Sequence, residues 1–232
     1  MYKKKKITLV IPCLNEEKGI QKVLIKIPDI IDEIIVVDNG SKDRTTEFAE
    51  KLGAKVIQEK ERGYGKAYLR GFAEASGDVV ITADGDGTYP IVLAQNLITN
   101  LLEDNLDFIS ACRFPLMDQK AMFFRNQIGN RIFSIIIYLL FNLKFKDALS
   151  GMWVFRKEIL KSFDIKSRGW AFSPELKIEA FSNSFLKCRE IRIPYAPRVG
   201  NVKLHPYADG WKALKFLLRK KYGSYTGLID DR

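Results

Sequence analysis

Short apolar segments alternate with helix-forming segments through the first half of the chain, and this alternation constrains the fold more than any other feature. The apolar runs are of the kind found in buried parallel strands, and the segments between them carry apolar residues at helical spacing. The predicted strands cover residues 7–12, 33–38, 54–58, 78–83 and 107–112. Strands and helices that alternate over short connections form a doubly wound, mainly parallel sheet flanked by helices. The sequence therefore predicts the α/β class.

The character of the chain changes after Arg113. The elements predicted there are a long helix at 121–145, a strand at 153–155, helices at 157–163 and 174–184, and a late strand at 188–194. A C-terminal helix over 210–221 has Trp211 and three leucines on one side and most of its basic residues on the other. This pattern is typical both of a helix lying on an anionic membrane surface and of one packed on its own domain.

The segment from Asp78 to Pro90 joins a predicted strand to two carboxylates that lie one residue apart. Asp84 and Asp86 follow the strand and are set in a glycine-rich turn. In an α/β sheet, ligands bind at the carboxyl ends of strands, so these carboxylates are expected where a ligand would lie. Oxygen ligands of this kind suit Mg²⁺ or Mn²⁺ carrying a phosphate. An acidic turn without a ligand has the same composition, since Asp and Gly are common turn residues.

Three strand ends with polar or acidic residues are expected to meet at one edge of the sheet. They are the segments 12–16, 38–41 and 84–88. The loop from Glu61 to Lys66 contains two glycines and two cations and precedes a predicted helix, so a phosphate there would meet helix N-terminal amides and Lys66. Its glycine spacing is not that of a dinucleotide site, and the chain has no Walker sequence.

The net charge is the unusual feature of the composition. The 38 Lys and Arg residues against 28 Asp and Glu give a formal net charge of +10, which favours an anionic partner. Nucleic acid is not expected, because the chain shows no recognised aromatic-basic binding module. The longest apolar run, at 132–141, is shorter than the roughly 20 residues of a membrane-spanning helix. We expect a soluble protein, or one bound peripherally at the cytoplasmic face of a membrane.

A series of short motifs, in this order and spacing, resembles one family of enzymes. The motifs lie at 11–16, 36–45, 63–67, Gly71, 75–78, 84–90, 147–151 and 198–204. Together they resemble the GT-A glycosyltransferases of family 2, and within them the polyprenyl-phosphate or dolichyl-phosphate sugar synthases, which include dolichol-phosphate mannosyltransferases. The resemblance covers residues 7 to about 218. It implies one GT-A domain over 1–232, with a nucleotide-sugar-binding half at 1–112 and an acceptor half with membrane-interface helices at 113–232.

The resemblance also implies roles for individual residues on the donor side. Asp86 is expected to bind the metal, Mg²⁺ or Mn²⁺, that bridges the donor diphosphate, with Asp84 beside it. The residues expected to hold the nucleotide-sugar are Pro12, Asn15, Glu16, Asp38, Lys66, Asp84, Arg198 and Lys203. Related enzymes often carry Gln where this chain has Thr88, so the part of Thr88 in metal binding is left open. The segments 38–41 and 63–65 look more like those of uridine-diphosphate sugar users than of guanosine-diphosphate ones.

The acceptor side is expected to hold a phosphate. Arg113, Arg125 and Arg131 resemble the family's acceptor-phosphate cations and are predicted to act in catalysis together with Asp86. A lipid phosphate is already ionised near pH 7 and attacks without a base, whereas a sugar hydroxyl needs one. Glu175 is the candidate base if one exists. The alternative is that Glu175 has no catalytic role and is favoured in the first turn of its helix by the helix dipole.

These features lead to one functional hypothesis with two rivals. The expected activity is metal-dependent, inverting transfer of a sugar from a nucleotide-sugar to polyprenyl or dolichyl phosphate, with peripheral membrane contact. The first rival keeps the fold and transfers the sugar to a glycan or a soluble hydroxyl compound. The second is a non-catalytic protein that binds a nucleotide or a lipid phosphate.

Overall fold

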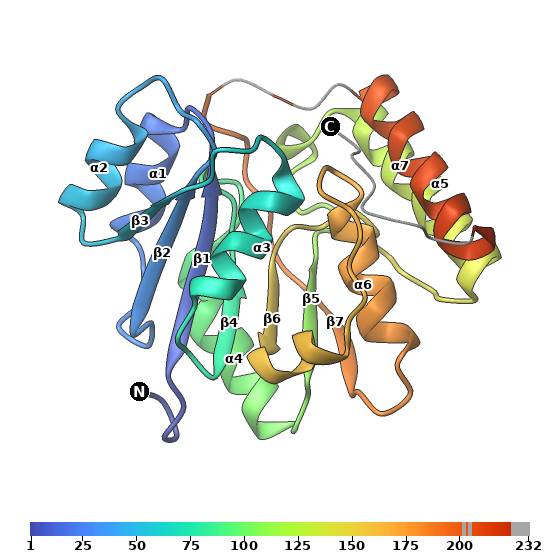
Figure 1. Ribbon diagram of the computed structural model, residues 1–232, viewed down its shortest axis with the longest axis horizontal. Helices are drawn as coiled ribbons and strands as arrows, with labels where there is room; N and C mark the ends of the chain where they lie inside the picture. Colours follow the sequence, from blue (N-terminus) through green and yellow to red (C-terminus); the bar gives the residue numbers. More distant parts are fainter. Residues whose placement is uncertain (201–202, 204–205, 224–232) are drawn as a thin grey trace.

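In the part of the chain that the structure describes, seven strands form a single sheet in the order β3-β2-β1-β4-β6-β5-β7 (Figure 1). The computed structural model describes residues 1–200, 203 and 206–223, so Leu204 and residues 201–202 of the motif at 198–204 lie outside the described residues. The strands are β1 (Ile7–Cys13), β2 (Glu33–Asp38), β3 (Lys55–Gln58), β4 (Val79–Thr82), β5 (Phe108–Cys112), β6 (Trp153–Arg156) and β7 (Cys188–Arg192). All seven fall at positions where the sequence predicted a strand.

The sheet is parallel except at one strand. β1 pairs in parallel with β2 and β4, β2 with β3, and β5 with β7, whereas β6 runs antiparallel to both β4 and β5. The prediction of a mainly parallel sheet is confirmed. Because β1 lies between β2 and β4, the strand order reverses there, and such a reversal opens a crevice at the carboxyl ends of the strands.

Helices cover both faces of the sheet (Figure 1). The α-helices are α1 (Glu17–Leu24), α2 (Thr45–Lys51), α3 (Tyr64–Glu74), α4 (Ala94–Glu103), α5 (Phe124–Phe141), α6 (Phe172–Ser182) and α7 (Pro206–Tyr222). One core cluster joins the sheet to α1, α2 and α4, and a second joins it to α3 and α6. Alternate residues of β1 enter the two clusters: Leu9 and Ile11 the first, Val10 the second.

In the second half, two of the predicted helices differ from the structure in more than a small shift of their ends. The long helix predicted at 121–145 is shorter, because Asn142 adopts a left-handed conformation at φ 58° and ends α5 at Phe141. At its other end, α5 begins at Phe124, and the predicted first residue, Ala121, belongs to a separate 3₁₀ turn, η2 (Gln119–Ala121). The helix predicted at 157–163 is a 3₁₀ helix, η3 (Lys157–Ser162).

α5 and α7 pack side by side beyond α6, away from the sheet (Figure 1). A third core cluster of Ile137 from α5, Ala171 and Ile178 from the α6 region, and Phe216 and Leu217 from α7 joins them. The opposite side of α5 exposes a row of large apolar residues, namely Phe124, Ile128, Ile132, Ile135 and Leu139. Within the described residues, no helix combines the length and apolarity needed to cross a membrane.

Candidate functional site

The loops after β1 and β2 are joined by hydrogen bonds that fix the polar residues predicted there. The amide of Asn15 donates to Ser41 Oγ at 2.8 Å, and Asn15 Oδ1 accepts from the amide of Lys42 at 2.7 Å. The carboxylate of Asp38, at the end of β2, accepts from the amide of Ser41 at 3.1 Å. The strand ends that hold Asn15 and Asp38 are therefore neighbours, as the topology predicts.

Asp86 lies after β4 with its two carboxylate oxygens in different environments. Oδ1 accepts from the hydroxyl of Thr88 at 2.7 Å and from the Thr88 amide at 3.0 Å. Oδ2 lies 2.8 Å from Nη1 of Arg198. Both Asp86 and Thr88 are buried. Through these two hydrogen bonds, Thr88 fixes the orientation of the Asp86 carboxylate.

Asp84 is surrounded by aromatic hydroxyls. Those of Tyr64 and Tyr68, both from α3, lie 3.3 Å from Asp84 Oδ1. Burial, and after it the negative charge of Asp86, raises the pKa of Asp84 to about 7. Two carboxylates close together in a buried site carry negative charge that a cation would stabilise.

The segment after β7 brings two cations, Arg198 to Asp86 and Glu16, and Lys203 to Glu16. Arg198 also pairs with Glu16, and Lys203 pairs with the same Glu16 oxygen and donates to the carbonyl of Asn15 at 3.1 Å. The segment is attached along its backbone, because the amide of Val199 donates to the carbonyl of Asp86 at 3.0 Å. Residues more than 180 positions apart, Glu16 and Arg198, are thereby in contact.

The residues present fit a divalent cation that shares its shell with a phosphate. Asp84 and Asp86 offer only oxygen ligands, the type that Mg²⁺ and Mn²⁺ prefer. Glu16 Oε2, beside them, is buried and has no hydrogen-bond partner within the described part of the chain. In the part of the chain that the structure describes, no group of three or more His, Cys, Asp or Glu side chains could hold a metal alone. The remaining ligands would have to be phosphate oxygens and water.

The glycine-rich loop is attached to the end of β2 by a residue that the sequence reasoning missed. Asn39 donates from Nδ2 to the carbonyls of Glu59 and Glu61, and its Oδ1 accepts from the amide of Gly63 at 2.8 Å. Lys66, in the first turn of α3, pairs with Glu61. Asn39 is buried and follows Asp38 directly. The available signal in the sequence was its position in the segment 38–41, one of the three strand ends expected to meet at one edge of the sheet.

The predicted acceptor arginines lie in two different environments. Arg113, just after β5, is buried and forms two 2.7 Å hydrogen bonds through Nε and Nη2 to the carboxylate of Asp147. Although burial alone would raise the pKa of Asp147, the charge and hydrogen bonds of Arg113 lower it. Arg125 and Arg131 are exposed on α5. The structure therefore places one arginine in a fixed pair and two on the surface.

Glu175 is fully buried in the first turn of α6 and already has several partners. Its carboxylate accepts from the amides of Lys166 and Ser167, the latter at 2.7 Å, and pairs with Lys220 of α7 at 2.9 Å. Burial raises its pKa, although Lys220 opposes this. These contacts join α6 to α7 and to the preceding loop, and they favour a structural role for this carboxylate.

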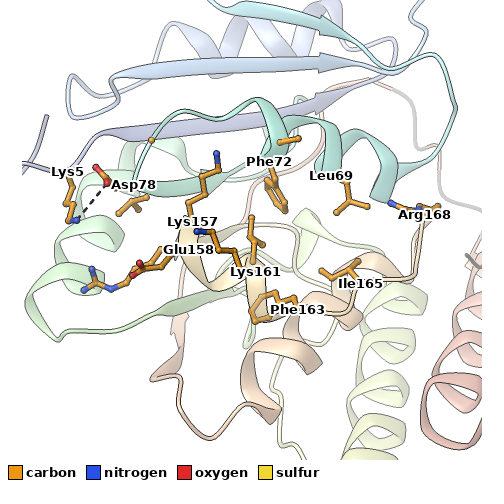
Figure 2. A pocket seen from close by; sticks show the side chains of 15 residues that line it. Lys5, Leu69, Phe72, Asp78, Lys157, Glu158, Lys161, Phe163, Ile165 and Arg168 are labelled. Atoms are coloured by element: carbon orange, nitrogen blue, oxygen red, sulfur yellow. Dashed lines mark ion pairs between the residues drawn. The ribbon is translucent and has the colours of Figure 1, made fainter. Parts of the chain in front are cut away.

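A groove of about 690 Å³ lies elsewhere, between α3 and the segment that includes η3. Figure 2 shows Leu69 and Phe72 of α3 facing Phe163 and Ile165 across it. An ion pair of Lys5 and Asp78, 3.8 Å long, lies at one end. None of the predicted site residues lines this groove. The polar site is therefore defined by the strand ends and not by this cavity.

Other residues that sequence reasoning missed are small or aromatic. Tyr64 and Tyr68 contact Asp84, as described above. Gly19 of α1 packs against the acidic turn so closely that a Cβ there would lie 2.3 Å from the carbonyl oxygen of Gly85. The sequence did contain a signal for Gly19. Helical spacing places this glycine on the same buried face of α1 as Ile20 and Val23, where a larger residue would be expected.

Sequence comparison relates the chain to known transferases. Residues 8–163 match the family described as Glycosyl transferase family 2. The dolichyl-phosphate hexose transferase of Haloferax volcanii is 33% identical over 207 residues, which cover 88% of this chain and 89% of that protein. The low-salt glycan biosynthesis hexosyltransferase Agl6 of the same organism is 31% identical over 220 residues. That match covers 91% of this chain and 53% of Agl6, so the chain spans about half the length of that relative. The dolichol-phosphate mannosyltransferase of Pyrococcus furiosus is 28% identical over 186 residues, covering 75% of this chain and 53% of the relative.

Structure comparison relates the whole fold to a solved enzyme. The glucosyl-3-phosphoglycerate synthase of Mycobacterium tuberculosis, crystallised with Mn²⁺, UDP and phosphoglyceric acid, matches with a TM-score of 0.78 and 24% identity. The match covers 97% of this chain and 81% of that one. A second crystal structure of the same enzyme, with Mg²⁺ and UDP, matches with a TM-score of 0.76. The predicted GT-A fold is confirmed by this likeness.

Proposed function

The chain belongs to glycosyl transferase family 2, and from this we propose that it transfers a sugar from a nucleotide-sugar to polyprenyl or dolichyl phosphate at the cytoplasmic face of a membrane. The observation that carries the proposal is the cluster of Glu16, Asp86, Arg198 and Lys203 beside Asp84, at the point where the strand order reverses. Buried carboxylates and cations in contact suit a ligand that combines a metal with a diphosphate. The names of two relatives, which specify dolichyl or dolichol phosphate, support the acceptor.

On the donor side, this chain's residues bind and orient the nucleotide-sugar. Pro12, Asn15 and Asp38 line the ends of β1 and β2, where the base and ribose would lie. Asp84 and Asp86 would hold Mg²⁺ or Mn²⁺, which when bound neutralises charge on the departing nucleoside diphosphate. Thr88 holds the Asp86 carboxylate in one orientation, while Arg198, Lys203 and Lys66 offer cations to the phosphates. A uridine-diphosphate sugar is the donor that the loop sequences favour.

On the acceptor side, the chemistry needs a bound phosphate oxygen and no base. An ionised phosphate oxygen attacks the anomeric carbon as the bond to the diphosphate breaks, so the configuration inverts and no proton has to be removed. Arg113 presents a guanidinium whose orientation Asp147 fixes, and Arg125 and Arg131 offer exposed cations on α5. The apolar row on the same helix would receive the isoprenoid tail.

A partition assay tests the acceptor. Enzyme is incubated with a radiolabelled UDP-sugar or GDP-sugar, Mn²⁺ or Mg²⁺, and polyprenyl phosphate, and the label is extracted into organic solvent. Label in the organic phase supports the proposal. Label in a water-soluble product made from an added hydroxyl compound would assign the chain to the first rival function, and nucleotide binding without any transfer would assign it to the second.

Asp86→Ala tests the donor site in the same assay. We expect transfer to fall by a factor of about 10² to 10³, because the variant loses a preorganised charge at the leaving group. The matched control is Asp29→Ala, at an exposed position outside the site, which should retain wild-type transfer. Full activity of the Asp86 variant with metal present would contradict the assigned role.

A further inference from the structure

Arg198 lies between the carboxylates of Asp86 and Glu16. Its Nη1 is 2.8 Å from Asp86 Oδ2, and its other terminal nitrogen pairs with Glu16. The contact is held in register by the backbone, since the amides of Ala196 and Val199 donate to the carbonyls of Thr88 and Asp86, each at 3.0 Å. The guanidinium is therefore directed at Asp86 by its own chain segment.

The two oxygens of Asp86 divide the possible ligands between them. Thr88 occupies Oδ1 with two hydrogen bonds, which leaves Oδ2 as the oxygen available to a cation. Arg198 takes that oxygen. A metal ion that arrives alone therefore meets a carboxylate whose charge is already balanced.

The arrangement is not fully satisfied. Among the residues that the structure describes, Glu16 Oε2 and Arg198 Nε are both buried without a hydrogen-bond partner, although Arg198 and Glu16 are in contact. Buried polar atoms without partners are disfavoured, and each points to a further ligand at the cluster. A diphosphate would offer acceptors to Arg198 Nε and to Lys203, the second cation on Glu16.

We propose that Arg198 is an exchangeable counter-ion of Asp86, which it leaves for the diphosphate when metal and nucleotide bind together. The inference rests on the proposed function in taking a metal and a nucleoside diphosphate as the ligands. Metal alone has to displace the guanidinium, whereas metal with diphosphate gives the guanidinium a new anionic partner. Metal and nucleotide therefore bind with positive coupling through Arg198, and each raises the affinity for the other by the same factor.

Mn²⁺ binding in the absence of nucleotide tests the exchange. Free Mn²⁺ is measured by electron paramagnetic resonance during titration of the wild type and of Arg198→Gln, Lys203→Gln and Arg189→Gln. Lys203→Gln removes one charge from the same cluster without freeing Asp86, and Arg189 pairs with Asp104 on the surface. We expect Arg198→Gln to bind Mn²⁺ about tenfold more tightly than the wild type, the factor that corresponds to one charge-assisted hydrogen bond. Lys203→Gln should gain less, and Arg189→Gln should not change.

The same titration with UDP present measures the coupling. In the wild type UDP should tighten Mn²⁺ binding, and in Arg198→Gln this tightening should be smaller, since Asp86 is already free. Equal gains in Arg198→Gln and Lys203→Gln would show a general charge effect and overturn the proposal. Unchanged or weaker Mn²⁺ binding by Arg198→Gln would overturn it as well.

A measurement on the unaltered chain covers the case in which Arg198→Gln does not fold. Phenylglyoxal modifies accessible arginines, and the extent at each position is read by peptide mass spectrometry. Arg198 should react slowly without ligand, faster with saturating Mn²⁺ alone and slowly again with Mn²⁺ and UDP, while exposed Arg189 stays constant. An Arg198 reactivity that does not rise with Mn²⁺ alone would refute the exchange. Neither arm needs sugar transfer, so a failed transfer assay and a failed exchange are separate results.

Discussion

Arg113 and Asp147 form a buried pair in which each charge depends on the other. The side chain of Asp147 is fully buried and that of Arg113 is 8% exposed. Removing one partner from such a pair leaves an uncompensated buried charge and costs about 3–5 kcal/mol. We expect Asp147→Asn to lower the free energy of unfolding in urea by about that amount. The control is Asp104→Asn in the exposed pair with Arg189, which should change stability little.

The transfer rate of the Asp147 variant separates its two possible consequences. If Asp147 only stabilises the fold, the variant should transfer sugar normally under conditions where it is folded. If Asp147 also fixes Arg113 for the acceptor phosphate, KM for polyprenyl phosphate should rise, while KM for the nucleotide-sugar stays unchanged. An unchanged free energy of unfolding in Asp147→Asn would contradict the prediction that the buried pair with Arg113 stabilises the fold.

Gly19 allows α1 to approach the acidic turn. A Cβ at this position would lie 2.3 Å from Gly85 O and 2.8 Å from the Cα of Asp86, so backbone must move. We expect Gly19→Ala to cost about 1–3 kcal/mol of stability and to weaken Mn²⁺-dependent UDP binding, measured by urea unfolding and by calorimetry. The control is Gly129→Ala in α5, where a Cβ meets nothing within 4 Å and stability should rise slightly. Wild-type stability and UDP binding in Gly19→Ala would show that the turn adapts freely.

At single residues, the sequence predicted best those whose chemistry is visible in the side chain. Asn15, Glu16, Asp86, Arg198 and Lys203 were all named as donor residues, and the structure brings all five into one contact network. The functional roles assigned to these five residues, and to Lys66, Asp84 and Arg113, remain predictions. Missed residues act through shape or through the backbone: Gly19 by lacking a side chain, and Asn39 by bonding to three peptide groups. Such contacts depend on tertiary distances that no local pattern contains.

α6 and α7 are joined by an ion pair that also decides how Glu175 should be interpreted. Glu175 is fully buried and Lys220 nearly so, and the two lie 2.9 Å apart. We expect Glu175→Gln and Lys220→Met each to destabilise the protein, and the double variant to lose less than the sum, because both remove the same contact. Urea unfolding of the four proteins measures this. A Glu175→Gln variant of normal stability with a large loss of kcat would instead support a catalytic base.

At the level of elements, local patterns predicted the order and type of the strands well and the helix ends less well. Apolar runs sufficed for β1, β4 and β5, because these strands are buried on both faces and have no polar face. The end of α5 depended on the conformation of Asn142, and η3 on a tight 3₁₀ turn, and neither follows from apolar spacing. The sequence also did not show that β6 is antiparallel, since strand direction depends on the path of the chain between strands.

For the whole molecule, the exposed apolar row on α5 and the net charge of +10 together predict binding to anionic membranes. Phe124 and Leu139 are each 74% exposed. Both side chains can enter the membrane–water interface without breaking any contact described above. We expect the wild type to sediment with vesicles of phosphatidylcholine and phosphatidylglycerol, and less so as salt screens the charge term. Phe124→Ser with Leu139→Ser should reduce this binding strongly and leave the melting temperature unchanged.

The matched control for the vesicle experiment is Phe185→Ser, which removes an aromatic side chain that is 92% exposed between α6 and β7. If apolar insertion occurs through α5, the control should bind vesicles like the wild type. If charge alone attracts the protein, all three proteins should bind equally and lose binding equally with salt. If the proposed acceptor is correct, transfer to polyprenyl phosphate in vesicles should then follow the binding, because that acceptor would be confined to the vesicle surface. Transfer to a short-chain, water-soluble prenyl phosphate should be unaffected by the two serine substitutions, which separates membrane docking from catalysis.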